Sequence, residues 1–248
     1  MEQEKEMNIK EAISQRHSVR QYQDRPITEE VRTELEKVIA ECNRESGLKM
    51  QLILNDPECF DTLLGHYGKF TNANNYIAVV GSKEFKDLER RAGYYGQRVV
   101  LEAQKMGLNT CWVAGTYGKG KCKADKNAGE KILCVIAVGY GENSGKKHRS
   151  KPLEKLCGVP KEEMPKWFED GMKAAMMAPT AVNQQKFYIY LEDGEAVIAA
   201  KSGMLTQLDQ GIVRYNFEAA SGHSCKEKRE VSFWRWSYKP EISYLDYE

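Results

Sequence analysis

The chain has 248 residues, enough for one large domain or two small ones with a substantial buried core. It carries 37 Lys and Arg against 36 Asp and Glu, so no overall field directs it to nucleic acid or to an anionic membrane. No apolar run approaches the roughly 20 residues of a membrane span, and the charged N-terminus lacks the apolar core of a secretory signal. Seven scattered cysteines without a Cys-x-x-Cys pair indicate reduced thiols, so we expect a cytoplasmic protein.

Helices and strands alternate in the first half of the predicted structure. A short helix is expected from Asn8 to Gln15, and Thr28 is expected to cap a second helix with an apolar stripe. A long helix from Lys86 to Met106 stops at Gly107. Apolar runs predict strands at Met50–Leu54, Tyr76–Val80, Thr110–Ala114 and Ile132–Val138. The last of these runs is the most apolar, which predicts a central strand.

The second half begins with a basic, turn-rich crossover from Gly139 to Lys155. A helix is expected from Glu163 to Met177. Asp193-Gly194 between two apolar runs is a strong hairpin signal. A last helix is expected from Leu205 to Ala220, capped by Gly222. The tail from Val231 to Trp236 is compatible with an edge strand or with a clamp on a neighbour.

Arg16-His17-Ser18-Val19-Arg20 places two guanidinium groups and a hydroxyl within five residues at the end of the first helix. Planar guanidinium forks beside a hydroxyl donor suit a dianionic phosphate. A solvated basic helix end fits the same residues when they are taken alone.

Ala178 to Gln185 is a small, polar stretch between a helix and a strand. Pro179 restricts the backbone, and Thr180 and Asn183 offer short hydrogen-bonding groups suited to a flat heterocycle or to sugar hydroxyls. A plain connecting loop is the alternative.

Gly115 to Cys122 differs by one residue from a P-loop, because Cys122 replaces the Ser or Thr that would hold magnesium. A flexible lysine-rich loop is the simpler interpretation, and a nucleotide hydrolase is the remote one. The four histidines are dispersed, and no metal site is expected.

Four of these segments together resemble the FMN-dependent nitroreductase family. Arg-x-Ser-x-Arg is similar to its opening motif, and Gly107-Leu108 followed by Trp112-Val113-Ala114-Gly115 is similar to its Gly-Leu-x-x-x-Trp-x-x-Gly segment. Lys147-x-Arg149 resembles its second phosphate clamp. Ala-Pro-Thr-Ala-x-Asn, ending at Asn183, resembles its Ala-Pro-Ser-x-x-Asn loop. The resemblance implies an α+β fold with a central mixed, mainly antiparallel sheet flanked by helices.

The resemblance also implies a set of FMN-binding residues. Both parts of the phosphate clamp would bind the phosphate and ribityl oxygens. Lys69 would lie near the pyrimidine edge of the ring, and the end of the third strand would lie near flavin N5. The full set is Arg16, His17, Ser18, Arg20, Lys69, Val113, Ala114, Gly115, Lys147, Arg149, Pro179, Thr180, Ala181 and Asn183.

One departure from the family pattern concerns the position of the Ala-Pro-Thr loop. In ordinary members this loop follows the second helix and reaches the partner subunit's flavin. Here Asn43-Arg44-Glu45-Ser46-Gly47 occupies that position without the motif, which appears in the second half instead. We therefore expect a single-chain pseudo-dimer: residues 1–157 as a flavin-binding repeat, and residues 158–248 as a degenerate second repeat that supplies the loop. The two repeats would form one compact unit with one FMN.

The resemblance implies an FMN oxidoreductase in which NAD(P)H reduces the flavin and a nitroaromatic, quinone or similar acceptor reoxidises it. No protein residue need act as a nucleophile or general base. A flavin-binding protein for storage or sensing, without turnover, is the alternative from another class. We expect no nucleic-acid or membrane partner, and a monomer or weak homo-oligomer.

Overall fold

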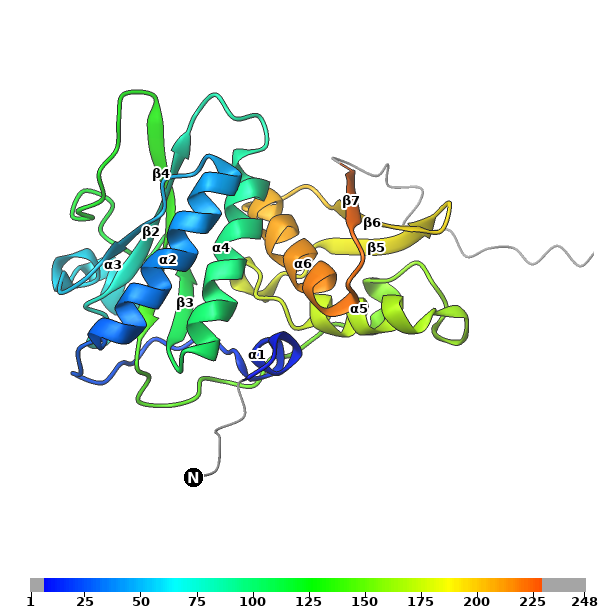
Figure 1. The fold of residues 1–248 in the computed structure, drawn as a ribbon, viewed down its shortest axis with the longest axis horizontal. Helices are drawn as coiled ribbons and strands as arrows, with labels where there is room; N and C mark the ends of the chain where they lie inside the picture. The colour runs from blue at the N-terminus through cyan, green and yellow to red at the C-terminus, as the bar shows by residue number, and fades with distance from the viewer. Residues whose placement is uncertain (1–6, 229–248) are drawn as a thin grey trace, which may run out of the picture.

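Two β-sheets lie at opposite ends of the molecule, with the long helices α4 and α6 side by side between them (Figure 1). The computed structural model describes residues 7–228. The segment Val231–Trp236, and with it the predicted edge strand or clamp, lies outside the described residues.

The first sheet has the strand order β1-β2-β4-β3, and every neighbouring pair is antiparallel. Its strands are β1 (Gln51–Ile53), β2 (Tyr76–Ser82), β3 (Asn109–Val113) and β4 (Glu130–Gly139). The interior position of β4 confirms the prediction from its apolar run, since a strand paired on both edges and covered by helices favours apolar side chains.

The helices of this half are α1 (Ile9–Gln15), α2 (Glu29–Ser46), the short α3 (Leu63–Tyr67) and α4 (Leu88–Lys105). The Thr28 side chain accepts from the Val31 amide and caps α2 as expected. Gly107 adopts φ 78° immediately after α4, a left-handed conformation that glycine reaches without a Cβ penalty.

The second sheet has the order β5-β6-β7, formed by β5 (Phe187–Glu192), β6 (Glu195–Ala200) and β7 (Cys225–Lys228). Asp193 and Gly194 join β5 to β6 at φ 54° and 78°, which confirms the predicted tight hairpin. The β6–β7 pair is parallel, so the strands of the protein are mixed but mainly antiparallel. They are divided between two sheets.

Helices α5 (Lys166–Met176) and α6 (Thr206–Ser221) cover the second sheet. The sequence predicted that the first of these would begin at Glu163. It begins after Pro165, because proline restricts the residue before it and the preceding residues form a separate 3-10 turn, Lys161–Glu163. Further 3-10 turns occupy Pro57–Cys59, Leu153–Lys155 and Ala181–Asn183.

Glycines allow α4 and α6 to approach closely. A Cβ at Gly93 would lie 2.1 Å from the Leu208 carbonyl oxygen, and one at Gly211 would lie 2.0 Å from that of Arg90. Below this contact, the buried Gln97 side chain donates to Asn216 Oδ1 at 3.0 Å. The helix pair is therefore held by backbone proximity and by a satisfied polar contact.

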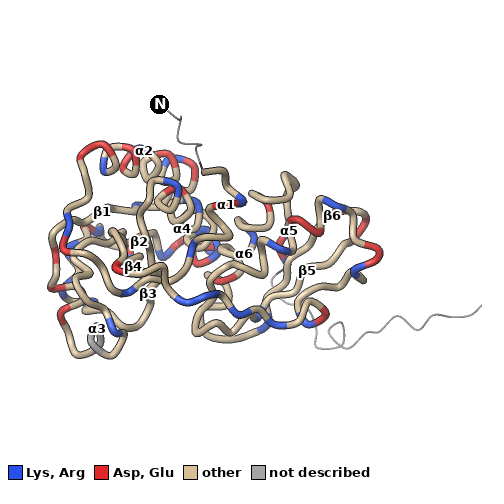
Figure 2. Tube along the Cα trace, turned by 90° about the horizontal axis from the view of Figure 1, so that it is seen from below, with Lys and Arg blue, Asp and Glu red and all other residues tan. Residues whose placement is uncertain are grey.

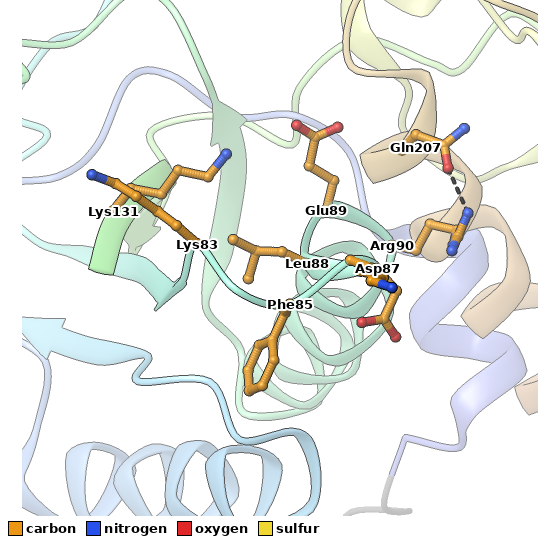
Figure 3. A pocket seen from close by; sticks show the side chains of 9 residues that line it. Lys83, Phe85, Asp87, Leu88, Glu89, Arg90, Lys131 and Gln207 are labelled. Atoms are coloured by element: carbon orange, nitrogen blue, oxygen red, sulfur yellow. Dashed lines mark hydrogen bonds between the residues drawn. The ribbon is translucent and has the colours of Figure 1, made fainter. Parts of the chain in front are cut away.

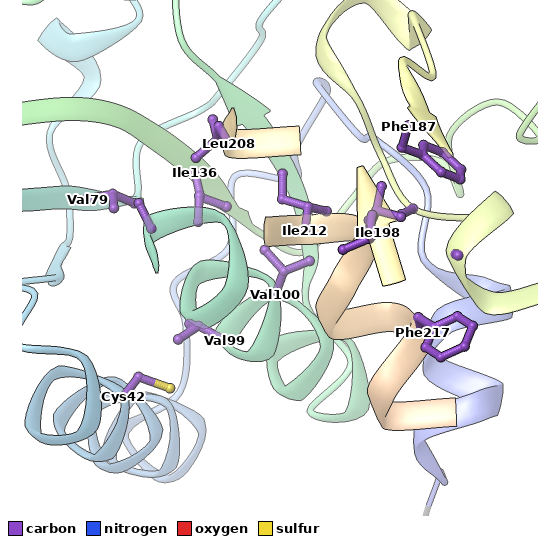
Figure 4. Close-up of a cluster of buried hydrophobic side chains, with 14 of the residues drawn as sticks. Cys42, Val79, Val99, Val100, Ile136, Phe187, Ile198, Leu208, Ile212 and Phe217 are labelled. Carbon is purple, nitrogen blue, oxygen red and sulfur yellow. The ribbon is translucent and has the colours of Figure 1, made fainter. Parts of the chain in front are cut away.

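The largest apolar cluster is continuous across both halves of the chain (Figure 4). Val79 and Ile136 of the first sheet, Val100 of α4, Ile212 of α6 and Ile198 of the second sheet all belong to it. A shared core of this kind makes the two sheets parts of one folded unit. No helix within residues 7–228 is long and apolar enough to cross a bilayer.

Candidate functional site

The guanidinium of Arg16 is buried at the end of α1 without an acidic partner among the described residues. Its side chain is 4% exposed, and its Nη1 atom has no hydrogen-bond partner. Burial lowers the pKa of Arg16 to about 10, which leaves the group charged at neutral pH. A buried, uncompensated cation is costly, so this position is suited to an anion from outside the chain.

Other unsatisfied polar atoms surround Arg16. His17 Nδ1, His148 Nε2 and Thr110 Oγ1 are buried and lack hydrogen-bond partners. Thr110 pairs with Ser18 across a parallel bridge, and its carbonyl oxygen accepts from the Val19 amide at 3.1 Å. The segment 16–19 therefore runs along the edge of β3 with several hydrogen-bonding groups unused.

His148 approaches this cluster from the crossover between β4 and α5. Burial, with smaller contributions from the positive charges of Arg16 and His17, lowers the pKa of His148. The nearby backbone of Met176 opposes this shift. Side chains alternate along an extended segment, so His148 faces inward while Lys147 and Arg149 are exposed.

The basic crossover is attached to the loop after α5 through the carbonyl oxygen of Arg149. Asn183 Nδ2 and Gln185 Nε2 both donate to that oxygen, at 2.9 and 2.7 Å. The Gln185 Oε1 atom accepts from the Lys151 amide at 2.8 Å. These bonds bring the predicted second clamp and the predicted Ala-Pro-Thr loop together, as a shared site requires.

Backbone conformation makes the loop after α5 unusual. Val182, Asn183 and Gln185 adopt positive φ values of 45°, 55° and 42°. This conformation is costly for a β-branched residue. Asp209 of α6 holds the strained turn by accepting from the Ala181 amide at 2.9 Å and from the Gln184 side chain at 2.7 Å.

Lys69 lies on the segment after α3, which is attached to the Arg20 end of the Arg16 segment. It is exposed, with φ 61°, and Thr71 two residues later donates its amide to the Arg20 carbonyl oxygen at 3.0 Å. A Cβ at Gly68 would lie 2.9 Å from Thr116 Oγ1, so this segment also contacts the loop that follows β3.

The end of β3 carries small or apolar side chains, so its backbone is its main polar surface. Val113 is buried, Ala114 is half-buried and Gly115 is exposed. A Cβ at Gly115 would meet no atom within 4 Å, so the surface at this point is open. Peptide groups there are accessible to a ligand.

The predicted residues therefore fall into two groups. The first group lies on segments that the contacts above bring close together: 16–20, 68–71, 110–116, 147–151 and 179–185. The second group is Lys147 and Arg149, whose side chains are exposed to solvent. Arg149 takes part in the contacts only through its carbonyl oxygen, which accepts from Asn183. Lysine and arginine (blue in Figure 2) recur along the crossover from β4 towards α5.

The sequence did not single out His148, Thr110 or Asp209. Position 148 could have been found from its place between the two exposed basic residues, because alternation turns the middle side chain the other way. Asp209 carried no such signal, since an acid in the first turn of a helix is commonly a surface residue.

A separate cavity of about 270 Å³ lies at the start of α4 (Figure 3). Lysines and carboxylates line it together, and Arg90 there donates to Gln207 at 2.7 Å. A second cavity, of about 200 Å³, lies beside Gln185, with Lys151, Lys155, Lys186 and Lys201 on its walls. Neither contains the Arg16 cluster.

Residues 114–129 contain no helix. A P-loop needs a helix N-terminus directly after its glycines, so the nucleotide-hydrolase interpretation lacks its structural context. Among residues 7–228, no three His, Cys, Asp or Glu side chains are grouped as a metal site would require.

Comparison with known proteins identifies the family of the chain. A family model described as "Putative TM nitroreductase" matches residues 8–221. The chain belongs to this nitroreductase family. A search of curated proteins found no match for this family member.

Solved structures similar to this nitroreductase-family protein include a putative nitroreductase from Thermotoga maritima. It has a TM-score of 0.64 and 21% sequence identity, over 89% of this chain and 86% of that chain. A putative nitroreductase from Desulfovibrio desulfuricans, solved in complex with FMN, has a TM-score of 0.48 and 22% identity, over 61% of this chain and 96% of that chain. The α+β fold predicted from the sequence is confirmed, and the protein is an oxidoreductase by family.

Proposed function

We propose that this protein is an FMN-dependent oxidoreductase that takes electrons from NAD(P)H and passes them to a nitroaromatic, quinone or similar small acceptor. The observation that carries the proposal is the buried, unpaired Arg16 guanidinium within a cluster of unused hydrogen-bonding groups. Membership of the nitroreductase family gives that anion site its context.

The residues present fit the FMN phosphate. Arg16 offers a charged donor. His17 and Ser18 lie next to it in the chain, and the Val19–Thr110 hydrogen bond holds Thr110 beside them. His148 approaches Arg16 from the crossover. A dianionic phosphate would compensate the guanidinium and favour the protonated form of His148. Arg20 lies at the exposed end of the same segment.

The remaining predicted residues would hold the rest of the cofactor. Lys69 would lie at the pyrimidine edge, where its charge favours the reduced anionic ring. Peptide groups from Val113 to Gly115 would approach N5. Pro179, Thr180, Ala181 and Asn183 would cover the ring from the second half of the chain.

Bound FMN supplies the hydride and electron chemistry. The chain's own residues bind the phosphate, orient the ring and exclude water, and none of them is required as a nucleophile. Specificity for the donor and acceptor would depend on what the covering loop leaves open.

The placement of the Ala-Pro-Thr loop supports the single-chain pseudo-dimer. Asn183 and Gln185 in the second half bind the Arg149 carbonyl oxygen in the first, so the loop is attached within one chain. We therefore propose residues 1–157 as the flavin-binding repeat, residues 158–248 as the repeat that supplies the loop, and one FMN per chain.

The test is the absorbance spectrum of the purified protein after incubation with FMN, with flavin quantified per chain. The expected result is about one flavin per chain, the stoichiometry that a single phosphate clamp allows. Arg16→Ala should abolish stable binding. Arg32→Ala is the matched control, because Arg32 lies on the exposed face of α2 and pairs with Glu36. A wild-type protein that takes up no flavin contradicts the proposal.

Turnover separates an enzyme from a flavin-storage or flavin-sensing protein. Rapid mixing of the flavin-loaded protein with NADH and with NADPH should bleach the flavin absorbance, and a quinone or nitroaromatic should restore it. Stable flavin binding without bleaching by either donor would identify the non-catalytic alternative.

A further inference from the structure

Two cysteines far apart in the sequence meet on the opposite face of the first sheet from α4. Cys59 ends the 3-10 turn Pro57–Cys59 and is fully buried, whereas Cys122 is half-buried in the loop between β3 and β4. Their thiols lie close enough to act on each other's acidity. Both are reduced in the structure.

Backbone contacts hold the two segments in register. The Gly118 amide donates to the Cys59 carbonyl oxygen at 2.8 Å, and the Cys122 amide donates to the Gly118 carbonyl oxygen at 3.1 Å. The glycine-rich stretch 115–122 therefore forms a turn whose backbone is bonded to Cys59. This turn holds Cys122 beside Cys59.

Polar groups around the pair distinguish its two sulfurs. The Tyr76 hydroxyl donates to Asp56 at 2.7 Å, accepts from the Lys123 amide at 2.9 Å and lies near both thiols. Lys123 Nζ lies 2.9 Å from the buried Asp56 carboxylate and offsets its charge. The backbone of Ala124 acts on the Cys122 sulfur and not on that of Cys59, and it favours the thiolate at Cys122.

The acidities of the two thiols differ in direction. The neighbouring Cys59 thiol lowers the pKa of Cys122, whereas the Cys122 thiol and burial raise the pKa of Cys59. Burial raises the pKa of each of the other five cysteines, which are Cys42, Cys111, Cys134, Cys157 and Cys225. Cys122 alone combines partial exposure with thiolate character, the pattern of a reactive cysteine.

We propose that Cys122 and Cys59 form a redox-active dithiol, which a hydroperoxide converts to an intramolecular disulfide with Cys122 as the attacking sulfur and Cys59 as the resolving one. This site is distinct from the Arg16 cluster, and it does not depend on the function proposed above.

The reaction balances in two steps. The Cys122 thiolate attacks the terminal oxygen of the hydroperoxide, the O–O bond breaks, and the leaving alkoxide or hydroxide takes a proton, which leaves a sulfenic acid on Cys122. The Cys59 sulfur then attacks the Cys122 sulfur, the S–O bond breaks, and the departing hydroxide leaves as water with the Cys59 proton. Two thiols are oxidised and one peroxide bond is reduced.

The disulfide would join the loop after β3 covalently to the turn before α3. A dithiol reductant would reverse it by thiol–disulfide exchange. The proposal therefore gives the glycine-rich stretch Gly115 to Cys122 a redox role in place of phosphate binding.

The test uses the full chain, reduced, freed of reductant without oxygen and treated with an equimolar amount of hydrogen peroxide. We expect the intact mass to fall by two hydrogen atoms and peptide mapping to find Cys59 linked to Cys122. A sulfenic-acid trapping reagent should label Cys122 in Cys59→Ser, and Cys122 should be the first thiol alkylated in the reduced wild type.

Cys42→Ser is the matched control, because Cys42 is buried on α2 without a thiol partner, and it should form the disulfide normally. Cys122→Ser should form no disulfide. The wild-type mapping stands even if a variant fails to fold. Absence of the Cys59–Cys122 link in the wild type, or alkylation of another cysteine first, overturns the proposal.

Discussion

Gln185 donates through Nε2 to the carbonyl oxygen of Arg149 at 2.7 Å. The Oε1 atom of the same side chain accepts from the backbone amide of Lys151, so Gln185 binds the backbone of the crossover at two points. Gln185 is 3% exposed, and water cannot replace these bonds. The contact therefore fixes the position of the loop that we propose covers the flavin.

Gln185→Ala should lower FMN affinity about tenfold, which corresponds to the roughly 1.4 kcal/mol typical of lost buried hydrogen bonds. The reason is that the loop loses its attachment to the first half of the chain. Gln51→Ala is the matched control, because the Gln51 amide brackets Asp125 in the same way away from the site. Titration of each apoprotein with FMN measures the difference, and equal affinities in both variants would show that the loop does not contribute.

The segment that we propose binds phosphate and the loop that we propose covers the flavin could both be singled out from the sequence, because each depends on residue types at short spacing. Arg16 and Asn183 belong to such local patterns. His148 and Asp209 depend instead on how distant segments pack, since one is turned inward by the crossover and the other lies beneath a loop from another element. Local pattern does not encode such contacts, which is why both residues emerge only from the structure.

The helices, strands and turns also divide into features set by local sequence and features set by long-range packing. The turn at Asp193-Gly194 and the caps at Thr28 and Gly222 are set by local backbone chemistry, and all were predicted. The separation of β5–β7 from the first sheet was not, because strand partners are chosen by long-range packing around α4 and α6.

Gly211→Ala should destabilise the protein by about 2–4 kcal/mol, since overpacking against rigid backbone costs more than the gain in helix propensity. The added Cβ would lie 2.0 Å from the Arg90 carbonyl oxygen and would force α4 and α6 apart. Gly120→Ala is the control, because a Cβ there meets no atom within 4 Å. Urea unfolding of both variants tests this, and equal midpoints would contradict the close contact between the helices.

Asp209 predicts a pH dependence of stability. Burial raises its pKa from 3.8 to about 6, so the folded state binds more protons than the unfolded state between these values. Stability should therefore fall as pH rises through that window, by at most about 3 kcal/mol. Asp209→Asn keeps an acceptor for Ala181 and should remove this slope.

The measurement is urea unfolding of the wild type and Asp209→Asn between pH 4 and pH 7. His148, whose pKa is lowered by burial, contributes the opposite slope, since its folded neutral form loses stability as pH falls. Both proteins share that contribution, so the difference between the two curves isolates Asp209. Parallel curves would mean that the carboxyl is not perturbed.

Val182 provides a test of the strained loop. Its φ of 45° is left-handed, its side chain is 88% exposed, and almost no packing is lost when the side chain is removed. Val182→Gly should therefore stabilise the protein relative to Val182→Ala by about 1 kcal/mol, because only glycine adopts this conformation without a Cβ penalty. Both variants remove the two γ-methyl groups and differ only in Cβ, so thermal unfolding of the pair separates backbone strain from packing. Equal melting temperatures would show that the left-handed turn costs the folded state nothing.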